Sequence, residues 1–358
     1  MRRRTIRLIA AVALVAVAIA VAFILRKRAA PEPARLLPEA NAYVYVNLKP
    51  LRQLGIIGDK APPARDPDYE TFVRESGFQF ERDLDEAAFA IHSAPRLVDA
   101  EPGSGQPEAI RRYSEVFRGH FDSRRGADYL RKIAKSTEKY RDVEIFSIPL
   151  EGRTARVALL GVGIAAVSNT DGPQVIRSMV DRYKELALPF GGPTLVRKYY
   201  RRVPFGSLLW GIAAVGSGDG GNKETPLTLP GGYDLFFPSN TVLVGSVRYL
   251  TSIQLRAEAF AENPEQAKRI ADQVEAFLGI FHSLEDQLGP GGGDQDVKAV
   301  FSSLHVQLYK SRAILEASIP PAFLKKIFAE PPTQEFTGPP APEPLPAPAL
   351  PKPHKHRK

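Results

Sequence analysis

The chain has 358 residues, of which 44% belong to the hydrophobic class and 25% are charged. This balance excludes a wholly disordered or fibrous protein, and the length allows one large folded unit or two smaller ones. The chain has no cysteine, which excludes disulfides, thiol nucleophiles and zinc–thiolate sites.

The net charge of +8 comes from the two ends of the chain. Residues 1–28 carry seven basic side chains, and residues 351–358 carry four more. Removing these 11 from the total of 48 leaves 37 basic residues against 40 acidic ones. The body between the two ends is therefore close to neutral, and we expect no nucleic acid as a partner.

An uninterrupted apolar segment runs from Leu8 to Leu25. As a helix, these 18 residues span about 27 Å, which is enough to cross a membrane. A buried core helix and a cleaved signal peptide are the alternatives, but the segment ends at Arg26-Lys27-Arg28 rather than at a small-residue cleavage site. We predict a transmembrane helix that contacts the lipid bilayer through residues 8–25, with residues 1–7 in the cytoplasm and the bulk of the chain outside it.

The rest of the chain alternates predicted strands and helices, after a spacer over residues 26–40 that is rich in proline and alanine. Period-two apolar patterns predict the strands, and Asp122, Asp171 and Asn263 are predicted helix caps. In chain order we predict strand 41–48, helix 69–76, strands 87–92 and 113–121, helix 122–136, strands 156–160 and 164–168, a helix from 171, strands 242–249 and 252–260, helix 264–288, strands 305–309 and 313–319, and a short helix through 328.

The predicted elements recur as two strands followed by a helix. Such ββα units indicate antiparallel hairpins covered by helices, because a hairpin alone cannot bury one face. We therefore predict an exported α+β domain over residues 41–330. Residues 216–232 are rich in glycine and are either a loop or the boundary between two similar halves that meet near residues 190–235.

The predicted helix over residues 264–288 carries an apolar stripe in alternating steps of three and four residues. We expect this stripe to pack on the sheet, with coiled-coil pairing as the alternative. On this interpretation Phe277 is a buried side chain whose truncation to alanine costs about 3 to 5 kcal/mol. The stripe consists of Ala267, Ile270, Val274, Phe277, Phe281, Leu284 and Leu288.

Motifs for chemistry are scarce. Gly161-Val162-Gly163 partly matches a dinucleotide-binding fingerprint, but a second strand follows it where that fingerprint requires a helix, so we predict a hairpin turn. The histidines of the body do not have the spacing of metal-ligand pairs. Asp83 and Asp85 are interpreted as charges in the first turn of a helix, and Trp210 as a core residue. We predict no catalytic, metal-binding or cofactor-binding residues and no cofactor.

The densest basic and aromatic cluster of the body is a contact for an anion or a partner, or else a solvated helix face. If the cluster is helical, like charges stack at spacing i,i+4, and an anionic partner relieves their repulsion. The candidate residues are Arg197, Lys198, Tyr199, Tyr200, Arg201 and Arg202.

Residues 331–358 form a proline-rich tail with a basic tip, which we expect to be disordered and which either contacts anionic lipid or polymer or is inert. Three segments resemble a loose group of bacterial single-pass membrane-anchored proteins of unknown function: LLPEANAYVYVNL, EVFRGHFDSRRGADYL and VPFGSLLWGIAAV. The resemblance implies an architecture and gives no active site.

We predict a single-pass inner-membrane protein of the cell envelope whose exported domain acts by binding or scaffolding. Its partner is then an envelope protein or an anionic polymer. The alternative is an envelope hydrolase whose active site forms only in three dimensions. A pocket that joins Ser or Asp to His120 or His305 favours this alternative.

Overall fold

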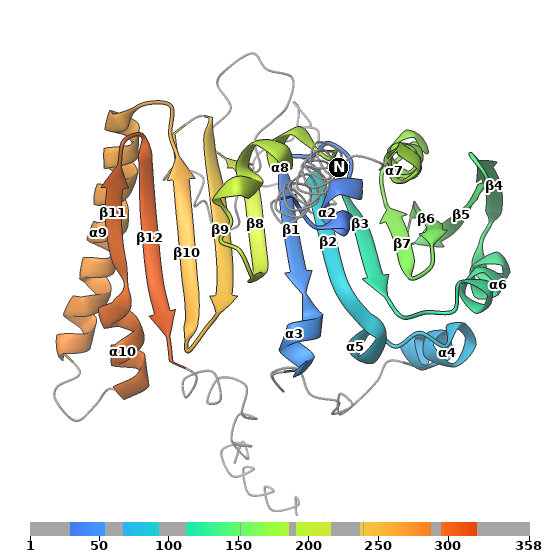
Figure 1. Cartoon of the computed structure of the whole chain (residues 1–358), viewed down its shortest axis with the longest axis horizontal. Coiled ribbons are helices and arrows are strands. Elements are labelled where there is room, and N and C mark those ends of the chain that lie inside the picture. Colours follow the sequence, from blue (N-terminus) through green and yellow to red (C-terminus); the bar gives the residue numbers. More distant parts are fainter. Residues whose placement is uncertain are drawn as a thin grey trace, which may run out of the picture.

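Figure 1 shows the computed structural model of the chain, a wide β-sheet flanked by helices. The structure describes residues 29–53, 67–92, 112–150, 152–185, 191–215, 237–238, 240–287 and 295–320. Within them, one sheet holds twelve strands in the order β11-β12-β10-β9-β8-β1-β2-β3-β7-β6-β5-β4. All of its neighbouring strands are antiparallel. The fold is therefore α+β, as the hairpin pattern predicts.

The bounds of the elements agree well with the predicted hairpins. The strands are β1 Ala42–Asn47, β2 Leu84–His92, β3 Arg112–Gly119, β4 Ser136–Tyr140, β5 Val143–Leu150, β6 Arg153–Gly161, β7 Ile164–Ser168, β8 Ser207–Val215, β9 Thr241–Tyr249, β10 Ile253–Phe260, β11 His305–Tyr309 and β12 Arg312–Ile319. The helices are α2 Glu32–Leu36, α3 Leu48–Gln53, α4 Pro67–Ser76, α5 Phe80–Asp83, α6 Ser123–Ile133, α7 Gln174–Glu185, α8 Thr194–Tyr199, the 3-10 helix η1 Tyr200–Arg202, α9 Pro264–Gln287 and α10 Gln295–Ser303.

The side chains of each strand alternate between two faces of the sheet. We call them the α7 face, which carries Val116 and Trp210, and the α9 face, which carries Val167 and Ala259. The strand register aligns one row of residues across the α9 face, from β6 to β10. Helix α6 packs near the β6 end of this row and helix α9 near the β10 end, so the two helices cover distant parts of the same face. The row runs Val157, Val167, Glu115, Phe89, Val44, Gly211, Gly245 and Ala257.

The main core lies on the α7 face, under α2, α7 and α8. Ile176 and Met179 of α7 are fully buried, and so is Leu36 of α2. Helix α2 corrects the prediction of a spacer over residues 26–40, because Leu36 and Leu37 pack in this core. The proline-rich sequence around this helix did not predict it, although proline is well tolerated in the first turn of a helix. The folded unit therefore begins before residue 36.

Local signals placed several element ends correctly. Asp122 caps α6, because its carboxylate accepts hydrogen bonds from the backbone N–H groups of Arg124 and Arg125. Asn263 caps α9 through the N–H of Gln266 at 2.9 Å. Gly161-Val162-Gly163 is the predicted hairpin turn, with Gly163 at a φ of 69°.

Three local predictions were wrong. Helix α6 ends at Ile133, three residues early, because the β4–β5 hairpin that sequence reasoning missed begins at Ser136. Helix α7 begins at Gln174, and Asp171 forms an ion pair with Arg112 instead of capping it. Asp83 does lie in the first turn of the short helix α5, but Asp85 lies in strand β2 and not in a helix. These changes follow from tertiary pairing that a local cap signal does not report.

The buried stripe of α9 also differs from the prediction. Ala267, Ile270 and Ala271 are buried, while Phe277 is 50% exposed. A straight α-helix turns once every 3.6 residues, so a stripe counted with a period of 3.5 drifts away from the packed side. Residues Phe281 and Leu284 belong to the part of α9 whose side chains the structure does not describe, and Leu288 lies outside the described residues.

We therefore expect truncation of Ile270, and not of Phe277, to cause the larger loss of stability along α9. Ile270→Ala should lower the free energy of unfolding by about 2 to 5 kcal/mol, because Ile270 is 2% exposed in the core that α9 forms with the sheet. Phe277→Ala should cost clearly less, because half of its surface is already in water. Denaturant unfolding of both variants measures the difference. Equal losses would show that Phe277 packs as closely as Ile270.

Several predictions fall on residues outside the described ranges. These are the transmembrane segment from Leu8 to Leu25, the short helix through residue 328 and the tail at 331–358. Among the helices that the structure does describe, none combines the length and the apolar character of a membrane span.

Candidate functional site

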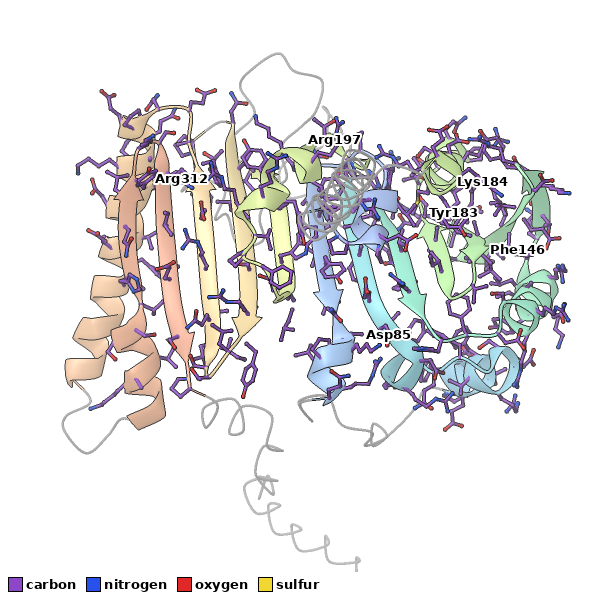
Figure 2. All side chains as sticks on the ribbon, in the orientation of Figure 1. Asp85, Phe146, Tyr183, Lys184, Arg197 and Arg312 are labelled. Atoms are coloured by element: carbon purple, nitrogen blue, oxygen red, sulfur yellow. The ribbon has the colours of Figure 1, made fainter. Side chains whose placement is uncertain are left out.

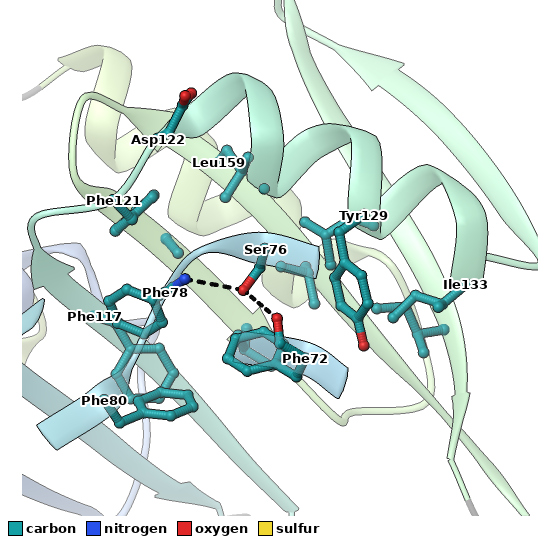
Figure 3. Close-up of a pocket in the computed structure, with 16 residues that line it drawn as sticks. Phe72, Ser76, Phe78, Phe80, Phe117, Phe121, Asp122, Tyr129, Ile133 and Leu159 are labelled. Carbon is teal, nitrogen blue, oxygen red and sulfur yellow. Dashed lines mark hydrogen bonds between the residues drawn. The ribbon is translucent and has the colours of Figure 1, made fainter. Parts of the chain in front are cut away.

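A cavity of about 280 Å³ lies between α4, α5 and α6 and the α9 face of β3, β5, β6 and β7 (Figure 3). Its lining is almost entirely apolar, and Phe80 and Ile133 at its edge are each more than one third exposed. The recess therefore reaches solvent. The lining residues are Phe72, Ser76, Phe78, Phe80, Phe117, Phe121, Asp122, Gly126, Tyr129, Leu130, Ile133, Ile148, Val157, Leu159, Ala165 and Val167.

Aromatic rings form one wall of the cavity. Phe78 and Phe80 meet edge to face with ring centroids 4.9 Å apart, and Phe72 stacks on Phe80 at 5.7 Å. Phe121 contacts Phe78 at 5.5 Å, and Tyr129 of α6 contacts Phe72 at the same distance. Such pairs add about 0.5 to 1.5 kcal/mol each beyond their burial. The wall is therefore a continuous ring cluster.

The turn between α4 and α5 places these rings. Gly77 adopts a φ of 74°, which favours glycine. The Ser76 hydroxyl donates to the Phe72 carbonyl at 2.6 Å and accepts from the N–H of Phe78 at 3.1 Å, as Figure 3 shows. These two bonds satisfy the only serine of the lining. The Ser76 hydroxyl group therefore binds the backbone and is not available to a ligand.

Arginines hold α4 and α5 against the rest of the domain. Arg125 of α6 donates to the carbonyl groups of Arg74 and Glu75 at the end of α4. Arg52 of α3 donates to the Leu84 carbonyl and to the Asp85 carboxylate. The aromatic wall is therefore supported from both α6 and α3.

The floor and the opposite wall are built from small or branched side chains. Val157, Ala165 and Val167 come from neighbouring strands, and Gly126 from α6. A Cβ atom added at Gly126 would meet only Leu159 Cδ1, at 3.8 Å. The space in the cavity thus exists because these positions carry little volume.

Glu115 is the one acidic residue in the sheet row that includes the cavity-lining residues Val157 and Val167. Its neighbours in the row are Phe89 on β2 and Val167 on β7. Within the described residues, no group forms a hydrogen bond or an ion pair with its carboxylate, and burial raises the pKa of Glu115 to about 7. The carboxyl group beside the cavity is therefore largely neutral below neutral pH.

The predicted basic cluster lies elsewhere, on α8 and η1 over the α7 face. The helix changes to 3-10 geometry at Tyr200, so the cluster is not the continuous α-helix that the predicted i,i+4 stacking requires. Tyr199 and Tyr200 are partly buried and contact Phe260 and Trp210. The basic residues Arg197, Lys198, Arg201 and Arg202 are exposed, and none of them forms an ion pair with another described residue.

The histidines give the hydrolase alternative little support among the described residues. His120 Nδ1 lies 3.2 Å from Asp85 Oδ2, but Arg52 also holds this carboxylate. His305 lines a groove together with Ser302 and Ser303, but its Nε2 pairs with Glu316 at 3.2 Å and its Nδ1 lies 2.9 Å from the Ser303 carbonyl oxygen. The hydroxyl groups of both serines donate to backbone carbonyls and not to the imidazole. His92 Nε2 lies 2.9 Å from Ser114 Oγ, a pair that sequence reasoning missed, and burial lowers the pKa of His92.

The hydroxyl beside His92 is closed to a substrate. Ser114 is fully buried, and its hydroxyl donates to Ser168, which in turn bonds Thr170. These groups therefore form an internal polar network that satisfies its own members. No group of three or more acidic or histidine side chains in the described part of the chain is arranged to hold a metal ion.

Sequence reasoning did not single out any residue of the cavity as functional. The signal available was a concentration of phenylalanine, since Phe72, Phe78, Phe80, Phe117 and Phe121 lie within 50 residues of one another. Such a concentration is also typical of an ordinary core. Only the tertiary fold reveals that the rings surround an unfilled space.

No protein-family model matches the chain, and no curated protein matches its sequence. Among solved structures, crystal form I of TP0453 is similar with a TM-score of 0.42 and 10% identity, over 84% of this chain and 98% of that chain. Crystal form III gives the same score and identity over 81% and 95%. Crystal form IV gives 0.40 and 11% over 83% and 96%.

Proposed function

We propose that this protein is a single-pass membrane-anchored protein of the bacterial envelope, and that its exported domain binds a single alkyl chain in the aromatic cavity. The observation that carries this proposal is the cavity between α6 and the sheet, lined by rings and aliphatic groups and open at its edge. Concave apolar sites of this kind are the usual binding sites for small apolar ligands.

The size and polarity of the cavity support an alkyl chain as the ligand. Its volume of about 280 Å³ is near the lower end of ligand cavities, which span roughly 300 to 1,000 Å³. One chain fits this space better than a lipid with two chains. Each methylene group removed from water contributes about 0.8 kcal/mol before the costs of ordering the chain.

The predicted anchor fits this role. A transmembrane helix from Leu8 to Leu25 tethers the domain beside a bilayer, which is itself a store of alkyl chains. We place the amino terminus in the cytoplasm and the domain outside it, in the inner membrane of the cell envelope. Binding rather than catalysis is then the main activity of the domain.

A photoreactive probe tests the proposal on the full-length protein in detergent. A medium-chain fatty alcohol that carries a diazirine should label peptides from residues 72–80 and from α6, because these line the cavity. Gly126→Phe should lower this labelling by about tenfold or more, since the added ring fills the space in front of Leu159. Mass spectrometry of the labelled peptides gives the readout.

Gly126→Ala is the matched control. It should keep the labelling and stabilise α6 by up to about 1 kcal/mol, because alanine favours the helix and its Cβ makes only an ordinary van der Waals contact with Leu159. Labelling confined to residues 8–25, or labelling that Gly126→Phe does not reduce, would contradict the proposal. The thermal unfolding of both variants separates loss of binding from loss of fold.

A further inference from the structure

A second recess lies on the α7 face of β9, β10 and β12, in the half of the sheet away from the aromatic cavity. This groove has a volume of about 640 Å³, and most of its lining residues are polar or charged. Its hydroxyl groups come from Ser246, Ser302, Ser303 and Ser318. The groove is bordered by Pro204, two residues after η1.

Most of the charged groups in and around this groove are already paired with one another. Arg256 contacts both Glu258 and Glu316, and Arg312 contacts Glu258 at 2.7 Å. His305 Nε2 lies 3.2 Å from Glu316. Two arginines and two glutamates therefore balance across these strands.

Arg248 is outside this balance. Its neighbours across the sheet are Ser207, Gln254 and, one strand further, Ser318, so its row contains no carboxylate. Its guanidinium donates to Gln254 Oε1 at 3.0 Å. Its Nε is buried and has no hydrogen-bond partner within the described residues. A buried donor without an acceptor destabilises the fold, and more strongly when it is charged.

An anion in the groove balances the charge of the Arg248 guanidinium, although it does not reach the buried Nε. It can accept hydrogen bonds from the guanidinium N–H groups of Arg248 that line the groove. The hydroxyl groups of Ser246, Ser302 and Ser303 already donate to backbone carbonyls, so the arginine is the main donor. A guanidinium group presents its donors as a planar fork, which matches phosphate oxygens well. The site therefore fits a phosphate group better than a neutral ligand.

More positive charge lies on the same face of the sheet. Figure 2 shows Arg197 on α8, and Arg202 of η1 lies over the Phe260 ring at 5.7 Å, at the end of β10. These residues form an exposed basic rim together with Lys198 and Arg201. Their positive charge therefore attracts a ligand with several negative charges toward this face and its groove.

We propose that this groove binds a soluble phosphate-bearing ligand, with one phosphate group held by Arg248 and the ligand attracted by the positive charge of the rim of Arg197, Lys198, Arg201 and Arg202. This gives the predicted anion contact a defined centre that the sequence did not indicate. The inference does not depend on the alkyl-chain site, because the two recesses have no lining residue in common.

Calorimetric titration of the full-length protein in neutral detergent with inorganic tripolyphosphate tests this inference. Arg248→Gln should weaken binding by about tenfold or more, because a hydrogen-bonded charge is lost. The double variant Arg201→Gln/Arg202→Gln should weaken it less and reduce its dependence on salt. All variants keep the basic residues at the two ends of the chain. A difference in affinity between variants therefore does not come from those residues.

Arg153→Gln is the matched control, because Arg153 Nη1 is also buried without a partner in the described structure but does not line the groove. Its affinity should equal that of the wild type. Unchanged affinity in Arg248→Gln, or no binding by the wild type, would overturn the inference, and so would affinity that depends on the rim alone. If Arg248→Gln does not fold, Arg248→Met replaces it, because methionine keeps an aliphatic side chain and removes the charge. Wild-type affinity in that variant would equally overturn the inference.

Discussion

Trp210→Ala should lower the free energy of unfolding by about 3 to 5 kcal/mol. Trp210 is 1% exposed and lies on β8, which joins β1 to β9 near the middle of the sheet. Its ring stacks on Tyr45 with centroids 5.4 Å apart and meets Tyr200 edge to face at the same distance. Truncation therefore leaves a cavity near the middle of the sheet, between β1 and β9.

Trp210→Ala should also disturb the segment that carries the basic rim. Tyr200 begins η1, so the ring of Trp210 supports the segment that carries Arg201 and Arg202. We expect phosphate-ligand binding to weaken together with stability in Trp210→Ala. Chemical denaturation followed by circular dichroism measures the first effect, and the calorimetric titration measures the second.

Trp210→Phe is the appropriate control. The indole Nε1 is buried with no hydrogen-bond partner among the described residues, so phenylalanine removes an unpaired polar group while it keeps most of the ring contact. Its cost should be clearly smaller than that of alanine. If both variants lose the same free energy, the effect of Trp210 does not come from the packing of its ring.

Glu115→Gln should stabilise the protein by up to about 3 kcal/mol at pH 8 and should have little effect at pH 4. Burial raises the pKa of Glu115 from 4.5 to about 7 in the folded protein. The folded state therefore keeps its proton between these two values while the unfolded state releases it. This contribution to stability is complete below pH 4.5 and is lost as the pH rises toward 7.

Denaturant midpoints of the wild type and Glu115→Gln, measured from pH 4 to pH 8, test this expectation. The difference between the two proteins isolates Glu115, because both contain Glu86, whose pKa burial also raises, and His92, whose pKa burial lowers. A difference that does not change with pH would show that the Glu115 carboxyl group is well solvated.

Local sequence patterns were enough to predict most of the elements. The alternation in residues 242–260 predicts the β9–β10 hairpin, and the glycines at 161 and 163 predict the turn between β6 and β7. Asp122 and Asn263 predict the starts of α6 and α9. These features depend on bonds between residues close in the chain, so a single sequence contains them.

The tertiary structure decided which side of each element is buried and where space remains. Leu36 is core although it lies in a predicted spacer, and Phe277 is half exposed although it lies in a predicted buried stripe, because burial depends on the partner that each side chain meets. Phe72 of α4 lines the cavity together with Val157 of β6, 85 residues further along the chain, and Arg248 lacks a carboxylate because of residues on neighbouring strands. Contacts between distant segments have no local pattern, so a single sequence does not reveal either recess.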